Sequence, residues 1–243
     1  MSKRKSQISS YPQPAAKRCK VTDDQGIRGE FEQFQPTEEF SNKYGMRLEG
    51  ADVYYQEDFI TPEIANIWYE QLNDIDTWYR PTLKVYGRDV IQSRLIAAYT
   101  TDPNMTVRYS GHPVILHTNY PPALQVIQAQ VEEQLGVTFN HVMLNKYEDG
   151  NVYIGKHSDT KENKVIASVS LGAVRTFIMS PKATARNKDG KSASGGIKRW
   201  ELANGSLLVM QGDTQKNWKH EIPKQPKITK GRISLTFRQL ASN

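Results

Sequence analysis

A histidine and an aspartate two residues apart, His157 and Asp159, form the pair in this chain that is best suited to chemistry. In an extended backbone, residues i and i+2 point to the same face, so this imidazole and this carboxylate can reach one point. Two histidines and one carboxylate form the facial triad that holds non-haem Fe(II) and leaves coordination positions open. Such pairs are also common on ordinary protein surfaces, so a metal site requires a third ligand from elsewhere in the chain.

The candidate third ligand is His220, which lies well downstream in the segment 217–223. We expect it to stand on a different strand of the same barrel, from which its ring can approach the first pair. The competing interpretation is a solvent-exposed histidine that precedes a turn.

The segment 232–238 supports a binding site because its polar and apolar residues alternate. Ile233, Leu235 and Phe237 share one face, and Arg232, Ser234, Thr236 and Arg238 share the other. Two arginines on the inner face of a barrel strand are costly unless anions compensate them. Because the guanidinium fork suits carboxylates, the two arginines could hold opposite ends of a small dicarboxylate. The alternative is a strand whose polar face is simply in water.

These residues require a folded domain, which we expect to span residues 51–243. Residues 1–50 are rich in polar residues and proline without sustained periodicity, which predicts a basic, largely disordered arm. Within this arm, the basic clusters 3–5 and 17–20 could form a bipartite nuclear localisation signal or contact nucleic acid. A solvated basic tail is the alternative.

The first part of the domain, residues 51–138, is expected to supply supporting helices. A strand is predicted near 51–60, followed by a helix that begins at Thr61-Pro62. Its apolar stripe predicts five core residues: Ile64, Ile67, Trp68, Leu72 and Ile75. A second helix is predicted to begin at Pro121-Pro122 and to end at Gly136. Its apolar face comprises Leu124, Ile127, Val131 and Leu135.

Between these helices, the segment 84–90 predicts a hairpin that turns at Tyr86-Gly87-Arg88. The region from there to Tyr120 is irregular and mixes arginines with aromatic residues: Arg94, Tyr99, Arg108, Tyr109, His112 and His117. This mixture suits base stacking and phosphate contact, although an ordinary tyrosine-rich connection would look similar.

The second part, residues 139–243, shows short β-type segments separated by turns, which predicts a sandwich or a jelly-roll core. The predicted strands lie near 139–147, 152–157, 165–172, 174–179, 197–202, 205–211 and 231–239. The segment 181–196 is predicted to be a flexible, exposed loop. The fold class expected is α+β, with N-terminal helices before this β-rich core.

The composition, 37% hydrophobic and 24% charged residues, fits a soluble protein with an ordinary core. No apolar run approaches the roughly 18 residues of a membrane span, and no secretory signal is expected. The single Cys19 excludes an internal disulfide and favours a reducing compartment. The formal net charge of +6 favours polyanionic partners.

An ordered series of motifs strongly resembles the AlkB family, Fe(II)- and 2-oxoglutarate-dependent dioxygenases that dealkylate nucleic acids. The motifs are Asn145-x-Tyr147, His157-x-Asp159, Ser168–Gly172 with Arg175-x-Phe177, Gly205–Met210, Trp218-x-His220 and Arg232-x-Ser-x-Thr-x-Arg238. The resemblance covers about residues 52–238 and is nearest to the eukaryotic DNA- and RNA-repair members. It implies a double-stranded β-helix (jelly-roll) core in residues 139–243, with supporting N-terminal helices and a nucleotide-recognition lid in residues 51–138.

The resemblance implies three cofactors or co-substrates: Fe(II), 2-oxoglutarate and O2. It assigns the metal ligands and catalytic residues to His157, Asp159 and His220. It assigns the 2-oxoglutarate contacts to Asn145, Tyr147, Arg232, Ser234 and Arg238. The implied reaction couples decarboxylation of 2-oxoglutarate to hydroxylation of an N-alkyl carbon, which leaves as an aldehyde.

The resemblance also implies a set of substrate contacts. A hairpin finger beside the extruded base matches Tyr86, Gly87 and Arg88. The base itself is sandwiched between Tyr109 and the His157 ring, under a lid that contains Arg94 and Tyr99. Two further contacts, Thr160 and Glu162, follow the metal motif. The sequence departs from the family where acidic residues usually follow His-x-Asp, because Thr160, Lys161 and Glu162 stand there. Ser234 replaces a common Asn, and Val107 a common aromatic residue.

The function predicted is therefore oxidative removal of N-alkyl lesions such as 1-methyladenine and 3-methylcytosine from DNA, with RNA as a further substrate class. One alternative is the same oxygenase chemistry on a protein side chain or a small molecule. Another is a nucleic-acid-binding protein without turnover. We expect a monomer without membrane attachment that acts in DNA repair in the nucleus, with the cytoplasm as a second location.

Overall fold

The computed structural model describes residues 32–85, 87–109, 112–160, 163–183 and 196–240. The two basic clusters of the N-terminal arm lie outside these residues, as does most of the predicted loop 181–196. Their predicted roles therefore stay predictions.

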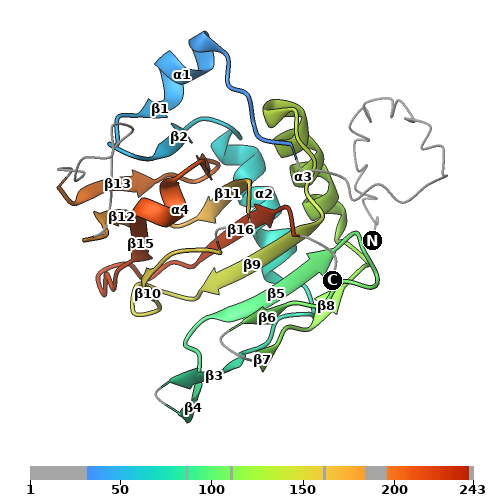
Figure 1. Cartoon of the computed structure of the whole chain (residues 1–243). Helices are drawn as coiled ribbons and strands as arrows, with labels where there is room; N and C mark the ends of the chain where they lie inside the picture. The colour runs from blue at the N-terminus through green and yellow to red at the C-terminus, as the bar shows by residue number, and fades with distance from the viewer. Residues whose placement is uncertain (1–31, 86, 110–111, 161–162, 184–195, 241–243) are drawn as a thin grey trace, which may run out of the picture. The chain divides into compact units, whose positions relative to one another are not determined.

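The core consists of two antiparallel-rich sheets (Figure 1). The larger, eight-stranded sheet has the order β1-β2-β14-β11-β16-β9-β5-β8. Its strands are β1 (Gly45–Met46), β2 (Asp52–Gln56), β5 (Leu95–Thr100), β8 (Leu116–His117), β9 (His141–Tyr147), β11 (Val165–Gly172), β14 (Leu207–Gln211) and β16 (Arg232–Arg238). The four-stranded sheet has the order β10-β15-β12-β13. It contains β10 (Ile154–His157), β12 (Arg175–Pro181), β13 (Lys198–Leu202) and β15 (Trp218–Ile222). This arrangement agrees with the expected jelly-roll core.

Two short hairpins and four helices complete the described fold. The hairpins are β3 (Thr82–Val85) with β4 (Arg88–Ile91), and β6 (Arg108–Tyr109) with β7 (His112–Pro113). The helices are α1 (Glu38–Tyr44), α2 (Pro62–Asn73), α3 (Pro122–Leu135) and α4 (Thr214–Asn217). Among the described residues, no helix is long and apolar enough to cross a membrane.

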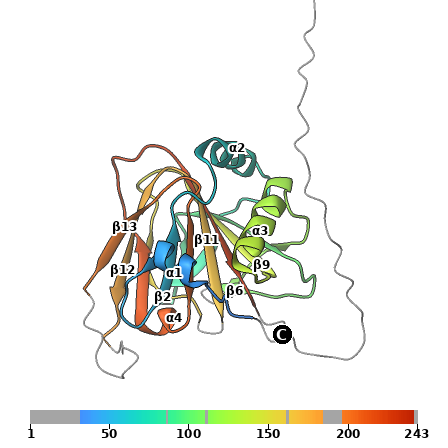
Figure 2. The same cartoon turned by 90° about the horizontal axis from the view of Figure 1, so that it is seen from above.

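The larger sheet has a hydrophobic layer on each face because its central strands alternate between two sets of neighbours. On one face, residues such as Leu144 and Leu235 pack with Leu124 and Ile127 of α3. On the other, Ile166 and Met210 pack with Phe177 and Trp218 of the smaller sheet. Figure 2 shows α3 on one side of β11 and strands β12 and β13 on the other. The second layer therefore lies inside the jelly roll.

The helix α3 forms as the sequence predicts. Leu124, Ile127, Val131 and Leu135 are buried on its inner face. Gly136 ends the helix in the left-handed region at φ 64°, and its N–H donates to the Glu132 carbonyl. Glycine suits this position because a side chain makes that conformation costly.

The apolar stripe predicted for α2 is wrong at two of its five positions. Ile64 and Ile67 are 38% and 49% exposed, whereas Leu72 is buried. The helix instead turns Ala65 and the ring of Tyr69 toward the sheet, where glycines of the neighbouring loops allow close approach. A Cβ on Gly172, for example, would lie 2.8 Å from the Tyr69 ring. The sequence periodicity could not show this, because the contact depends on loops far along the chain.

The boundary between arm and domain, expected at residue 50, is wrong for residues 32–50. Thr37 caps α1 by accepting a hydrogen bond from the Phe40 N–H at 3.1 Å. Phe34 and Leu48 are 5% and 8% exposed, in the two hydrophobic layers described above. The segment is therefore part of the folded unit, held by a few aromatic and aliphatic side chains in a polar stretch.

Candidate active site

One cavity opens between the two sheets and is lined by residues of both. The register of β9 with β16 places Tyr147 opposite Arg232, Asn145 opposite Ser234, and His141 opposite Arg238. Because side chains alternate along a strand, these residues share one face, and all of them line the cavity. The alternation predicted for the segment 232–238 is thus confirmed, and its polar face is turned inward.

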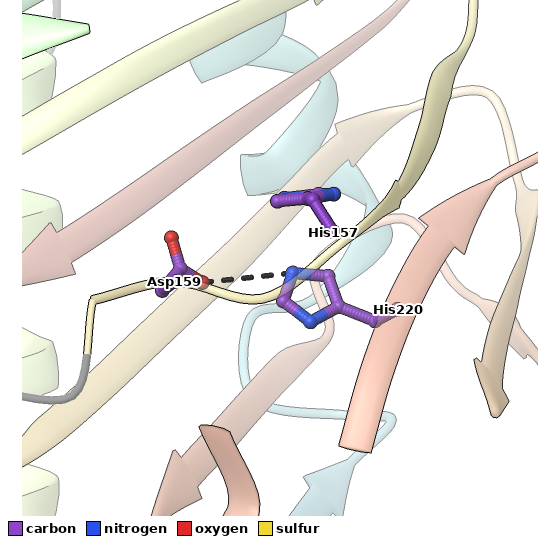
Figure 3. A group of neighbouring side chains, drawn as sticks. All are labelled: His157, Asp159 and His220. Atoms are coloured by element: carbon purple, nitrogen blue, oxygen red, sulfur yellow. Dashed lines mark ion pairs between the residues drawn. The ribbon is translucent and has the colours of Figure 1, made fainter. Parts of the chain in front are cut away.

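The predicted metal ligands His157, Asp159 and His220 meet in this cavity (Figure 3). His157 ends β10, Asp159 follows it, and His220 stands on β15 directly opposite His157 in the sheet register. One ligand atom from each residue lies within 4.8 Å of the others. The two imidazole rings are 4.3 Å apart, and Nε2 of His220 lies 3.5 Å from Oδ2 of Asp159. The expected strand for His220 therefore exists, and the alternative of an exposed histidine is wrong.

Neighbouring groups fix the orientation of each of these side chains. Nδ1 of His157 lies 2.9 Å from the Gly155 carbonyl, which favours the tautomer that leaves Nε2 available to a metal. The backbone N–H of Asp159 donates to Oε1 of Gln215 at 2.9 Å. The ring of Phe177 stacks on His220 at 5.5 Å. The cluster is therefore preorganised, as a metal site requires.

The electrostatics of the cluster favour the protonation states in which these groups bind metal. The pKa of His220 is lowered to about 3, mainly by burial and secondly by the neighbouring His157. Burial is also the main cause that lowers the pKa of His157. Burial alone would raise the pKa of Asp159, but Arg238 and the two imidazoles outweigh it and hold that pKa below its usual range. At neutral pH the site thus offers two neutral imidazoles and a carboxylate.

A second part of the cavity is built for an anion. Arg232 is 1% exposed, and its Nη2 donates to Oγ of Ser170 at 2.8 Å. Its Nε and Nη1 have no hydrogen-bond partner among the described residues. Its guanidinium lies 5.2 Å from the Tyr147 ring centroid. A buried guanidinium with unpaired donors is costly, so a carboxylate ligand would complete this site.

The other predicted co-substrate residues lie along the same cavity wall. Ser234 is buried, and its hydroxyl lies 3.1 Å from that of Ser168. Arg238 differs from Arg232, because its Nη2 donates to Oδ1 of Asp159 at 2.7 Å. Asn145 accepts a hydrogen bond from Nε of Arg94 at 3.1 Å. Their contacts with 2-oxoglutarate stay predictions, since these bonds describe the protein alone.

Two residues expected in the lid are buried. Tyr99 lies in β5, 1% exposed among the core side chains, and its hydroxyl pairs with Thr77 at 2.6 Å. Arg94 is 5% exposed and is held by Asn145 and by the Tyr153 carbonyl. The ring of Tyr99 packs against those of His117 and Tyr120, whereas Arg94 contacts Asn145 of the cavity wall, so its substrate contact stays a prediction.

The remaining predicted substrate residues divide into two groups. Tyr109 and Thr160 line the cavity, together with Val107. The hairpin of β3 and β4 exists, with Arg88 exposed and Gly87 in the left-handed region at φ 78°. Tyr86 and Glu162 lie outside the described residues. The contacts of both groups with a base stay predictions.

Two buried polar residues that line the cavity were given no role from the sequence, His141 and Asn163. Arg175, which belongs to the motif Arg175-x-Phe177, does not line the cavity, but its guanidinium lies 5.5 Å from the Tyr147 ring. The alternation of His141 with Asn145 and Tyr147 in one predicted strand was a signal that could have identified the histidine.

Comparison with known proteins agrees with this geometry. The family model of the 2OG-Fe(II) oxygenase superfamily matches residues 52–238. The DNA oxidative demethylase ALKBH2 of Homo sapiens is 34% identical over 205 residues, covering 80% of this chain and 76% of the relative. The ALKBH2 of Arabidopsis thaliana is 31% identical over 208 residues, covering 78% of this chain and 66% of the relative.

Two solved structures share the fold at low identity. The structure of OsALKBH1 aligns with a TM-score of 0.51 at 16% identity, covering 77% of this chain and 97% of that one. A prolyl hydroxylase from Trichoplax adhaerens, in complex with a hypoxia-inducible factor peptide, aligns with a TM-score of 0.52 at 13% identity. That alignment covers 84% of this chain and 86% of the hydroxylase.

The fold, the His-Asp-His cluster and the family match together define an Fe(II)- and 2-oxoglutarate-dependent dioxygenase, which uses O2 as its second substrate. Within this class, the chain belongs to the AlkB family.

Proposed function

We propose that this protein is an oxidative DNA demethylase that removes N-alkyl groups from damaged bases, of the 1-methyladenine and 3-methylcytosine type. The observation that carries the proposal is that the His157, Asp159 and His220 cluster, the anion site at Arg232 and the aromatic ring of Tyr109 line one cavity. The relatives named as DNA oxidative demethylases support DNA as the substrate.

The donor set fits iron, with His157, Asp159 and His220 as its ligands. Two imidazole nitrogens and one carboxylate oxygen match the facial triad of non-haem Fe(II) enzymes. Iron bound there, with 2-oxoglutarate and O2, supplies the oxidation that hydroxylates the N-alkyl carbon, and the protein supplies binding and orientation. The Gly155 carbonyl and the Gln215 side chain hold the ligands in place before the metal arrives.

The anion site fits 2-oxoglutarate, with Arg232 as the partner of a carboxylate. The two unpaired donors of Arg232 match a planar carboxylate, and Tyr147 and Ser234 flank the same position. Arg238 and Asn145 lie further along the same wall, toward Asp159. We assign these two residues to the end of the co-substrate nearer the metal ligands.

The base would enter between Tyr109 and the His157 ring, which line the same cavity. A base inside a duplex hides its alkyl group, so the target must be extruded or already single-stranded. The exposed hairpin around Gly87 and Arg88 is the candidate for stabilising the opened strand.

The proposal is tested with single-stranded oligonucleotides that carry one 1-methyladenine or one 3-methylcytosine. With Fe(II), 2-oxoglutarate and O2, mass spectrometry is expected to show loss of the methyl group. The Asp159→Ala variant is expected to lose this activity, because one ligand of the metal is missing. Asp58→Ala, an exposed aspartate outside the cavity, is the matched control and is expected to remain active.

The same assay distinguishes the alternatives. Succinate release without loss of methyl from any alkylated DNA or RNA oligonucleotide would favour a protein or small-molecule substrate. Oligonucleotide binding without succinate release would favour a binding protein. Comparing single-stranded DNA, duplex DNA and RNA with the same lesion identifies the preferred strand.

We also propose that the protein acts in the nucleus as a monomer, with a further cytoplasmic pool. The basic clusters 3–5 and 17–20 support the nuclear location, since they suit a bipartite import signal. Loss of nuclear signal from a tagged protein after both clusters are changed to alanine would support this. Light scattering after size-exclusion chromatography would measure the oligomeric state.

A further inference from the structure

The described residues that line the cavity offer little negative charge to a substrate. Among the described residues that line it, Asp159 is the one carboxylate. Its Oδ1 already accepts a hydrogen bond from Arg238, and its Oδ2 faces His220. Arg108 lines the same cavity and adds positive charge. Lys161 and Glu162 lie outside the described residues, and their formal charges cancel.

His141 adds an uncharged hydrogen-bonding group to this wall. It is 1% exposed, lines the cavity, and stands opposite Arg238 in the register of β9 with β16. Burial, followed by the charge of Arg238, lowers the pKa of His141 to about 3. A neutral imidazole has one donor and one acceptor. Neither of its ring nitrogens has a hydrogen-bond partner among the described residues.

Asn163 adds a second uncharged group near the position after the metal motif. Its Nδ2 donates to the hydroxyl of Thr160 at 2.8 Å and to the Thr160 carbonyl at 3.3 Å. Its Oδ1 is buried and has no partner among the described residues. Because Asn163 and Thr160 both line the cavity, the pair presents amide and hydroxyl groups where a carboxylate would attract a cation.

We propose that this cavity selects uncharged N-alkylated bases, such as 1-methylguanine and 3-methylthymine, over the cationic bases 1-methyladenine and 3-methylcytosine, with His141 and Asn163 recognising the base edge. The inference rests on the proposed dealkylation of nucleic-acid bases. The cationic bases stay substrates of that reaction, but with a lower kcat/KM than the uncharged ones.

Charge favours both uncharged bases, and hydrogen bonding further favours 1-methylguanine. A cationic base would lie near Arg238 without a free carboxylate among the described residues, which is repulsive at short range. An uncharged base avoids that repulsion, and 1-methylguanine also brings a carbonyl and an amino group beside its methyl group. The carbonyl of 1-methylguanine can accept from the N–H of His141, and its amino group can donate to Oδ1 of Asn163. Buried polar atoms that lack partners favour a ligand that supplies them.

Two matched pairs of oligonucleotides test the proposal. 1-Methyladenine and 1-methylguanine are both purines methylated at N1, and 3-methylcytosine and 3-methylthymine are both pyrimidines methylated at N3. Members of each pair thus differ mainly in charge and in their hydrogen-bonding edge. In single strands of one sequence, we expect a higher kcat/KM for the uncharged member of each pair. A higher kcat/KM for the cationic member of either pair would overturn the proposal.

Variants identify the residues responsible. Thr160→Asp places a carboxylate at the cavity and can still accept the Asn163 hydrogen bond. We therefore expect the ratio of kcat/KM for the cationic member to kcat/KM for the uncharged member of each pair to rise by roughly tenfold. Gln71→Glu adds the same charge to α2, on the opposite face of the large sheet, and is the matched control. His141→Phe removes the imidazole donor and acceptor, and is expected to reduce kcat/KM for 1-methylguanine by roughly tenfold. If these kcat/KM ratios were the same in Thr160→Asp as in Gln71→Glu, the charge at this position of the cavity would not decide the choice of base.

Binding provides a readout that does not depend on turnover. Mn(II) replaces Fe(II), and fluorescence anisotropy measures the affinity for the four oligonucleotides with 2-oxoglutarate present. Tighter binding of the uncharged members supports the inference, and tighter binding of the cationic members overturns it. If none of the four lesions is removed although binding is selective, the dealkylation proposal fails while the charge preference stands.

Discussion

Arg238 binds one oxygen of the Asp159 carboxylate, and the other oxygen of that carboxylate faces His220. Nη2 of Arg238 donates to Oδ1 at 2.7 Å, while Oδ2 of the same group lies 3.5 Å from Nε2 of His220. The arginine therefore fixes which oxygen faces the two imidazoles, and its charge keeps the carboxyl ionised. Groups that orient a ligand in this way are part of the metal site even though they do not bind the metal.

This relationship predicts the effect of Arg238→Gln on metal binding. Without the guanidinium, Asp159 loses its orienting partner, and we expect the affinity for Mn(II) to fall by about 10- to 100-fold. Titration followed by electron paramagnetic resonance measures the free metal. Arg199→Gln, an exposed arginine of β13, serves as the control. Equal affinities in the two variants would show that Arg238 does not orient the ligand.

Arg232→Met should separate co-substrate binding from stability. The native guanidinium is buried with two unpaired nitrogens, so replacing it by an apolar side chain of similar length is expected to leave the unliganded protein at least as stable. The increase in Tm that 2-oxoglutarate produces in the wild type is expected to disappear. Thermal unfolding with and without 2-oxoglutarate measures both effects. A variant that unfolds at lower temperature but keeps the 2-oxoglutarate shift would contradict the assigned role.

His141 should make stability depend on pH. Its pKa is lowered from 6.5 to about 3, so the folded protein disfavours the proton that the unfolded chain accepts. The neutral His141 therefore contributes its full share of the unfolding free energy above pH 6.5, and this share is lost as the pH falls toward 3. We expect the unfolding free energy of the wild type to fall more steeply than that of His141→Phe, by about 1.4 kcal/mol per pH unit. Urea unfolding of both proteins, without metal and between these pH values, measures this difference. If the unfolding free energies of the wild type and of His141→Phe fell in parallel with pH, the buried His141 would not be the cause.

Arg175 should be a main structural support of the site. Its guanidinium is fully buried and donates to the carbonyls of Asp149, Val152 and Pro223 and to the side chain of Gln225. It therefore joins the two loops that flank β10 and β15. Arg175→Gln leaves most of these acceptors without a donor, and we expect a loss of roughly 3–5 kcal/mol in unfolding free energy. Urea unfolding measures this, again with Arg199→Gln as the control. A loss as small as that of the control would show that the loops hold without it.

Local patterns were enough to predict much of the core and of the metal site. The alternation of Arg232 with Ile233 predicted both the strand and the face that lines the cavity, because one buried face determines the register of a strand. The spacing of His157 and Asp159 placed both side chains on one face, and their assignment as metal ligands also needed His220 and the family motifs. The helix α3 followed from an ordinary amphipathic pattern that ends in glycine.

The errors occurred where distant segments decide the environment of a residue. Tyr99 looked like a lid residue, but its side chain lies in the core against His117 and Tyr120. Ile64 and Ile67 fit the helical period of α2, yet Ala65 and Tyr69 face the sheet, where Gly172 at the end of β11 and the loop residues Gly205 and Gly231 allow close approach. Such contacts leave no periodic signal in the local sequence.

The most direct test of the central claim measures two products in one reaction. The wild type is incubated with Fe(II), 2-oxoglutarate, O2 and an oligonucleotide carrying one N-methylated base, and succinate and formaldehyde are quantified together. If His157, Asp159 and His220 hold the iron that oxidises the methyl group, about one formaldehyde appears per succinate, as the coupled reaction requires. Both products should be absent with Asp159→Ala and present with Asp58→Ala. Formaldehyde release that persists in Asp159→Ala would contradict the account.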